Sequence, residues 1–158
     1  MKNKFSPTIF IIFFLFISAC GYGKLNVANK NNINIDSITV TGDKRLGYSI
    51  KNNLMLLSSN NGKAKLDINL KAKKTKSIKE KNDVNKITKY NIVTSVKLTS
   101  RDNVFEKNLS KNFEQTLDYR VGNNHSDTLR NEKKATENSI DLMTDKIANY
   151  LIIYYSKK

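Results

Sequence analysis

The chain has 158 residues and carries 28 Lys and Arg against 14 Asp and Glu, a formal net charge of +14. With one cysteine and one histidine, it can form no internal disulfide and lacks the ligands of a usual zinc site. The length allows one domain with one core, and the charge favours an anionic partner: nucleic acid, acidic lipid headgroups or lipopolysaccharide phosphates.

Residues 1–19 have the pattern of an export signal. Lys2 and Lys4 precede an apolar run over 9–17, and the small residues Ser18 and Ala19 follow it. Even counted from Phe5, the apolar part would span only about 20 Å as a helix, against roughly 30 Å of hydrocarbon in a bilayer. We therefore expect residues 1–19 to direct export and then to be removed.

Cys20 follows Ile17, Ser18 and Ala19, an order that resembles the lipobox of bacterial lipoproteins. A thiolate at this position is a nucleophile that can be acylated, and a solitary cysteine in an exported chain has no disulfide partner within it. We expect lipidation at Cys20. The alternative is a chance cysteine beside an ordinary signal peptidase site. In lipoproteins, Gly21 in place of aspartate favours the outer membrane over the inner one.

Export favours membrane anions over nucleic acid as partners.

Residues 20–32 are polar and predict a flexible lipidated tether, followed by a single domain over 33–158. A short strand is expected over 37–41, after irregular chain or a bulge. Apolar residues then recur at helical spacing over 44–58, with Asp43 as a candidate N-cap.

Strict alternation from Ala64 to Ala72 predicts a half-buried strand with a basic outer face. The polar, lysine-rich stretch over 73–86 is expected to form a long exposed hairpin tip. Alternation resumes over 90–99, with Tyr90, Ile92 and Thr94 on the inward side.

A turn is expected at 101–103, and a further strand should point Phe105, Leu109, Phe113, Leu117 and Tyr119 inward. A last amphipathic helix should be capped by Ser126 or Asp127, with Leu129, Thr136, Ile140, Met143 and Ile147 on its inner face.

These elements predict an α+β fold in the order strand, helix, three strands, helix. Two amphipathic helices would lie on one face of a four-stranded, mostly antiparallel sheet as a two-layer sandwich. Each layer would bury its apolar side against the other.

Catalytic chemistry is not indicated. His125 lies in a polar turn, and the Gly-Tyr-Gly at 21–23 has no strand before it to form a phosphate-binding loop. The carboxylates Glu106, Glu114 and Asp118 lie beside many lysines, which favours solvated pairing over acid–base work. We expect a protein that is not an enzyme and has neither a metal site nor a cofactor.

The lipobox reading Ala19-Cys20-Gly21, the segment over 45–54, the alternating strands and the C-terminal helix together resemble the LptE family of lipopolysaccharide-assembly lipoproteins. The resemblance implies a lipoprotein at the inner leaflet of the outer membrane. It would plug the lumen of an LptD β-barrel, help that barrel to assemble and take part in lipopolysaccharide delivery.

A basic face could contact lipopolysaccharide phosphates through charge-assisted hydrogen bonds. The candidate residues for this contact are Lys71, Lys73, Lys74, Lys76, Lys79 and Lys81. For the lysines, the alternative is a solvated face that only keeps the domain soluble. For the whole chain, the alternative is a structural or ligand-binding lipoprotein of another envelope complex.

Overall fold

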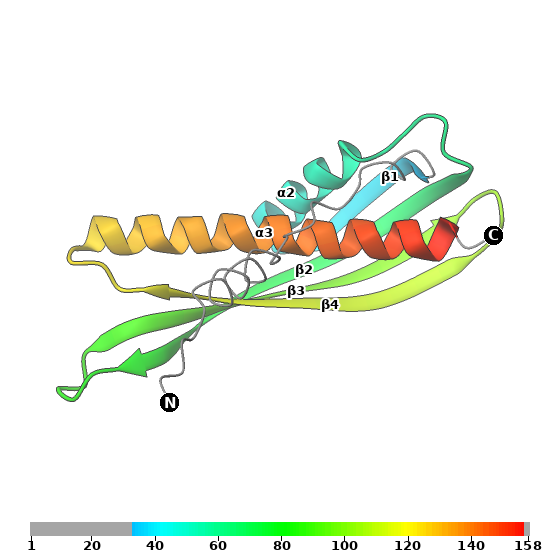
Figure 1. Ribbon diagram of the computed structural model, residues 1–158. Coiled ribbons are helices and arrows are strands. Elements are labelled where there is room, and N and C mark those ends of the chain that lie inside the picture. The colour runs from blue at the N-terminus through cyan, green and yellow to red at the C-terminus, as the bar shows by residue number, and fades with distance from the viewer. Residues whose placement is uncertain (1–32, 157–158) are drawn as a thin grey trace, which may run out of the picture.

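The computed structural model describes residues 33–156, which form one α+β sandwich (Figure 1). The export signal, Cys20 and the tether lie outside the described residues. The elements are β1 (Ile33–Gly42), α2 (Lys44–Met55), β2 (Ala64–Lys81), β3 (Ile87–Asp102), β4 (Asn108–Arg120) and α3 (His125–Ser156). The predicted fold class and element order are confirmed.

The four strands form one mixed sheet in the order β1-β2-β3-β4. β1 runs parallel to β2, whereas β2, β3 and β4 are antiparallel neighbours. The expected irregularity in β1 is a register shift between Ile35 and Ser37. The predicted start at Ser37 is wrong, because Ile33 and Ile35 already pair with β2 and are buried.

Asp43 caps α2 as predicted: its Oδ1 accepts a hydrogen bond from the Leu46 backbone N–H at 3.0 Å. The helix ends at Met55 and not at Ser58, because the N–H groups of Leu57 and Ser58 turn back to carbonyls three residues earlier. Leu57 still packs against the core, which explains why the helical spacing extended past the helix.

The stretch expected to be a hairpin tip is mostly strand. β2 continues to Lys81 and β3 begins at Ile87, so the turn itself covers only 82–86. Asn82 fixes this turn by accepting the Lys86 N–H at 2.8 Å. From Lys73 onward every residue of β2 is exposed, so this part of the strand shows no alternation of apolar and polar residues. It is held in place by its antiparallel pairing with β3.

The β3–β4 turn covers 103–107 and not 101–103, because Asp102 still belongs to β3. The predicted inward place of Phe105 is wrong: it lies in the turn and is 40% exposed.

Asn124, and not Ser126 or Asp127, caps α3, since its Oδ1 accepts the Asp127 N–H at 2.8 Å. Leu129, expected on the inner face of α3, is 51% exposed.

Two apolar clusters of unequal size hold the layers together. The large one joins β1, α2, the first half of β2, the second half of β3 and the C-terminal half of α3, with Leu66, Leu98 and Ile147 fully buried. The small one contains Ile92, Tyr119 and Ala135, with Tyr90 packed against them. We call the first region the body. The second, which contains β2 from Lys73, β3 up to Thr94, the end of β4 and the start of α3, we call the arm.

Candidate functional site

Both helices cover the same face of the sheet, and within the described residues the opposite face carries no helix (Figure 1). We call this the open face. The strand register arranges its side chains in rows that cross the sheet, one of which reads Thr41, Lys71, Lys97 and Asn112. Polar and charged residues therefore line the face that no other element covers.

Like charges lie directly opposite each other in that row. Lys71 pairs in register with Lys97, and Lys73 follows on the same side of β2. All three are exposed, and none forms an ion pair with another described residue. Like charges directly across a ladder destabilise a sheet, so this arrangement favours an anion that binds the open face.

The open face becomes polar and partly acidic toward the β3–β4 turn. A hollow of about 570 Å³ there is lined by Ser37, Asp67, Asn69 and Arg101 among others. Hydrogen bonds donated by Ser37 and Asn103, together with the nearby Arg101, hold the pKa of Asp67 below its usual value. Asp67 is therefore a satisfied anion, and the unpaired positive charge lies further along the face.

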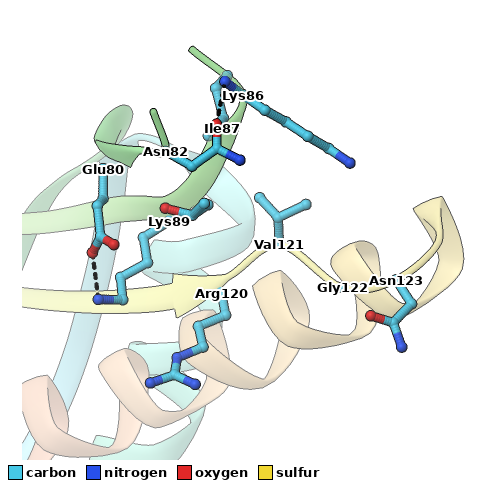
Figure 2. A pocket seen from close by; sticks show the side chains of 10 residues that line it. Glu80, Asn82, Lys86, Ile87, Lys89, Arg120, Val121, Gly122 and Asn123 are labelled. Atoms are coloured by element: carbon cyan, nitrogen blue, oxygen red, sulfur yellow. Dashed lines mark hydrogen bonds and ion pairs between the residues drawn. The ribbon is translucent and has the colours of Figure 1, made fainter. Parts of the chain in front are cut away.

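A second hollow, of about 520 Å³, lies where the hairpin meets the β4–α3 connection (Figure 2). Lys89 forms an ion pair with Glu80, and this hydrogen bond and charge lower the pKa of Glu80. Arg120 is the direct cross-strand partner of Lys89, and Lys86 also lines the hollow. Three cations and one carboxylate thus line this hollow, a composition that suits a bound anion.

No local pattern in the sequence marks this second hollow. Arg120 and Lys89 lie far apart in the chain and meet only through the β3–β4 register. Predicting this hollow would have required the length of the β2–β3 hairpin. The alternation of apolar residues does not indicate that length, because the residues of β2 from Lys73 onward are all exposed.

Lys76 lies on the face of the sheet that the helices cover, and its side chain joins β2 to α3 in the arm. Its ammonium lies 2.6 Å from Glu132 and 4.4 Å from the centre of the Tyr90 ring. The Tyr119 hydroxyl donates to the same Glu132 carboxylate at 2.8 Å. The cluster joins β2, β3, β4 and α3 where the apolar core is small.

The charges of this cluster support one another. The hydrogen bond from Lys76 lowers the pKa of Glu132, despite partial burial that acts the other way. Partial burial by itself lowers the pKa of Lys76, but its interactions with Glu132 and Tyr119 raise that pKa overall. Lys76 is therefore held as a cation by internal partners.

The six predicted lysines do not form one surface. Lys71, Lys73 and Lys79 lie on the open face, and Lys79 is paired with Asp118. Lys74 lines a hollow beside α2 and α3, Lys76 is held by Glu132, and Lys81 donates to the turn residue Asn85 at 2.9 Å. The role of these lysines in lipopolysaccharide binding stays a prediction.

Within residues 33–156 no three His, Cys, Asp or Glu side chains are grouped so that they could hold a metal ion. In the same range, neither helix combines the length and the apolar character needed to cross a bilayer.

Several solved structures of bacterial lipoproteins share this fold. Rare lipoprotein B from Shewanella oneidensis superposes with a TM-score of 0.54 at 14% identity, covering 73% of this chain and 93% of its own. Lipoprotein B from Nitrosomonas europaea gives 0.58 at 12% identity, covering 80% and 85%. A minor lipoprotein from Acinetobacter baumannii gives 0.52 at 10% identity, covering 79% and 94%. These likenesses establish the fold. No family model and no curated protein sequence matches the chain.

Proposed function

We propose that this chain is a lipoprotein of the Gram-negative envelope, exported, acylated on Cys20 and held at the periplasmic face of the outer membrane. One combination carries the proposal: a lipobox at 17–20 precedes a domain whose fold is that of several bacterial lipoproteins. A single myristoyl chain binds membranes only weakly, with K of about 10⁴ M⁻¹. The three acyl chains of a mature lipoprotein would make attachment effectively permanent.

We further propose that it acts without catalysis, as the partner of an outer-membrane β-barrel of the LptD kind. It would seat in the barrel lumen, help the barrel to assemble and take part in inserting lipopolysaccharide into the outer leaflet. Barrel lumens are polar, and the open face offers rows of hydroxyl, amide and ammonium groups to such a wall. The resemblance to LptE supports the identity of the partner.

Lipopolysaccharide phosphates are the anions that we propose for the open face. Lys71, Lys73 and Lys97 are the strongest candidates, because they are exposed, adjacent and without an ion-pair partner among the described residues. Ammonium groups at this spacing would bind a phosphate through charge-assisted hydrogen bonds. Lys76 is left out of this surface since Glu132 already neutralises it.

Affinity purification from detergent-solubilised membranes of the native host tests the partner. We expect a large β-barrel in stoichiometric amount with the wild-type chain, and its loss with Cys20→Ser, which cannot be acylated. Purification without a barrel, from a chain that is acylated and abundant, would contradict the plug function and favour another envelope complex.

A charge-matched pair of triple variants tests the anion surface. Replacing Lys71, Lys73 and Lys97 by Gln should weaken lipopolysaccharide binding about tenfold, because three exposed ion contacts of roughly 0.5 kcal/mol each sum to about 1.5 kcal/mol. Replacing Lys44, Lys133 and Lys134 by Gln removes the same charge elsewhere and should have little effect. Equal losses in both variants would show attraction by net charge alone. Unchanged binding after all six originally predicted lysines become Gln would remove the hypothesis for those residues.

A further inference from the structure

Large apolar side chains are exposed at one end of the body. Half of those that are exposed in the described part of the chain lie at the end of α2 and in the α2–β2 connection, in the β3–β4 turn, and in the last turns of α3: Met55, Leu56, Val104, Phe105 and Ile153. Leu56 is 83% exposed and Val104 is 50% exposed. We call this group the apolar end.

The three segments lie at the same end of the sheet, where β1 begins (Figure 1). The Ser59 N–H donates to the Ile33 carbonyl at 3.0 Å, which joins the α2–β2 connection to β1. The Asn103 N–H donates to the Lys65 carbonyl at 2.8 Å, which joins the β3–β4 turn to the start of β2. At this same end, the Tyr155 hydroxyl lies 2.9 Å from that of Ser100.

The exposed side chains project from fixed backbone. The buried Asp102 carboxylate accepts the N–H groups of Val104 at 2.9 Å and Phe105 at 3.4 Å, which sets the shape of the turn. The Leu56 N–H bonds to carbonyls of the last turn of α2. Apolar groups displayed by hydrogen-bonded turns are typical of a contact surface, since nothing in the turns themselves requires those side chains to be apolar.

The chain enters the domain at this end. Ile33, the first described residue, begins β1 beside the α2–β2 connection. Twelve residues separate Cys20 from Ile33 in the sequence, so the 13 residue steps between them can span at most about 47 Å when fully extended. If Cys20 is acylated as proposed above, on which this inference rests, its acyl chains lie within that reach of the apolar end.

The lysines in the same connections suit a lipid surface. Lys63 and Lys107 are exposed there, and Glu106 is an exposed carboxylate in the same turn as Lys107. Anionic headgroups attract such lysines, while apolar side chains enter the interface by roughly 5–10 Å.

We propose that the apolar end rests in the headgroup region of the leaflet that holds the acyl chains. The domain is then docked on the bilayer at two points, the lipid anchor and the apolar end. The opposite end, with the hairpin turn, faces away from that contact. The occupant is the lipid surface itself and needs no second protein.

Cys20 is the only cysteine of the chain, so in the acylated protein an introduced cysteine is the only free thiol. We would prepare full-length lipidated Leu56→Cys and Val104→Cys, label each with an environment-sensitive fluorophore and reconstitute them alone in vesicles of phosphatidylethanolamine and phosphatidylglycerol. The matched control is Val84→Cys in the hairpin turn, which is 80% exposed against 83% for Leu56.

With headgroup-quencher lipids, we expect labels at Leu56 and Val104 to lose at least half of their emission, while the label at Val84 loses little. Equal quenching at all three sites would show tumbling on the tether, and quenching at Val84 alone would show the reverse orientation; either result overturns the inference. Mass spectrometry of the same samples reports acylation of Cys20, so failure of the anchor is distinguished from failure of docking.

Discussion

The body and the arm are continuous through β2, β3 and α3, yet different forces hold them. In the body, fully buried aliphatic side chains from both layers make one large cluster. In the arm, an apolar cluster with only three buried residues and the Lys76–Glu132 ion pair, which two tyrosines support, hold the sheet and α3 together. The difference indicates that the body supplies the stability of the domain, while the arm is a polar, less firmly held extension available for contact with a partner.

Removing core volume from the body should have the largest effect. Leu98 is fully buried in a central strand, so Leu98→Ala should lower the free energy of unfolding by about 2–5 kcal/mol. Ile78→Ala in the arm, where the side chain is 50% exposed, should cost less than about 1 kcal/mol. Denaturant titration measures both, and similar losses would show that the arm is as tightly packed as the body.

Substituting a glycine at the junction of the body and the arm should have the second-largest effect on stability. Gly42 has φ of +84°, and a Cβ there would lie 2.1 Å from the Ala72 carbonyl oxygen. The same oxygen accepts the Asp43 N–H at 2.8 Å, so the strand cannot move away without losing the start of α2. Gly42→Ala should destabilise by about 2 kcal/mol or more. Thermal unfolding measures it, with Thr41→Ala as the control, and an unchanged midpoint would refute the close approach.

Breaking the arm cluster should have a smaller and more local effect. Glu132→Gln leaves the Lys76 ammonium without its ion pair and should cost about 1 kcal/mol. Hydrogen exchange should speed up in Tyr90 and its β3 neighbours while amides of the body keep their protection. Glu137→Gln, which removes a longer and more exposed pair to Lys133, is the control. Uniform loss of protection would contradict the separation of arm and body.

The pH dependence of the arm follows from the same cluster. The folded-state pKa of Glu132 is lowered, so its stabilisation is present above its unfolded value and is lost as the pH falls through the lowered value. The folded-state pKa of Lys76 is raised, so its stabilisation is present below its unfolded value and is lost as the pH rises through the raised value. The protection of amides in the arm against hydrogen exchange should therefore be constant between about pH 5 and 10 and fall outside that range. A titration centred near neutrality would contradict this assignment.

Relieving charge on the open face should change stability least. Lys97→Gln removes the repulsion across from Lys71 and should raise the free energy of unfolding by a few tenths of a kcal/mol at low salt. The gain should vanish at high salt. A loss of stability would mean that Lys97 has a favourable partner on the face.

Periodicity predicted the body well because burial imposes it. Ala64 to Ala72 alternate where one side faces the helices, and the spacing of Leu46, Ile50 and Leu54 marks α2 in the same way. In the arm both sides of β2 are exposed, so the strand left no pattern in the sequence. The cap at Asn124 was missed because Ser126 and Asp127 offer equally good capping side chains nearby.

The candidate site was only partly predictable for a related reason. Lysines could be counted, but the face on which each lies depends on where the strand continues and how it pairs. Lys97 was not proposed because its place opposite Lys71 appears only in the β2–β3 register. Likewise, nothing near Lys76 in the sequence indicated Glu132, which lies on α3.

Photo-crosslinking in cells of the native host tests the central claim most directly, that the open face contacts a β-barrel. A photoreactive residue at Lys73 on the open face should yield an adduct with an outer-membrane barrel protein, whereas the same residue at Leu142, exposed on α3, should yield much less. Absence of a barrel adduct at Lys73, or equal adducts at both positions, would contradict the account.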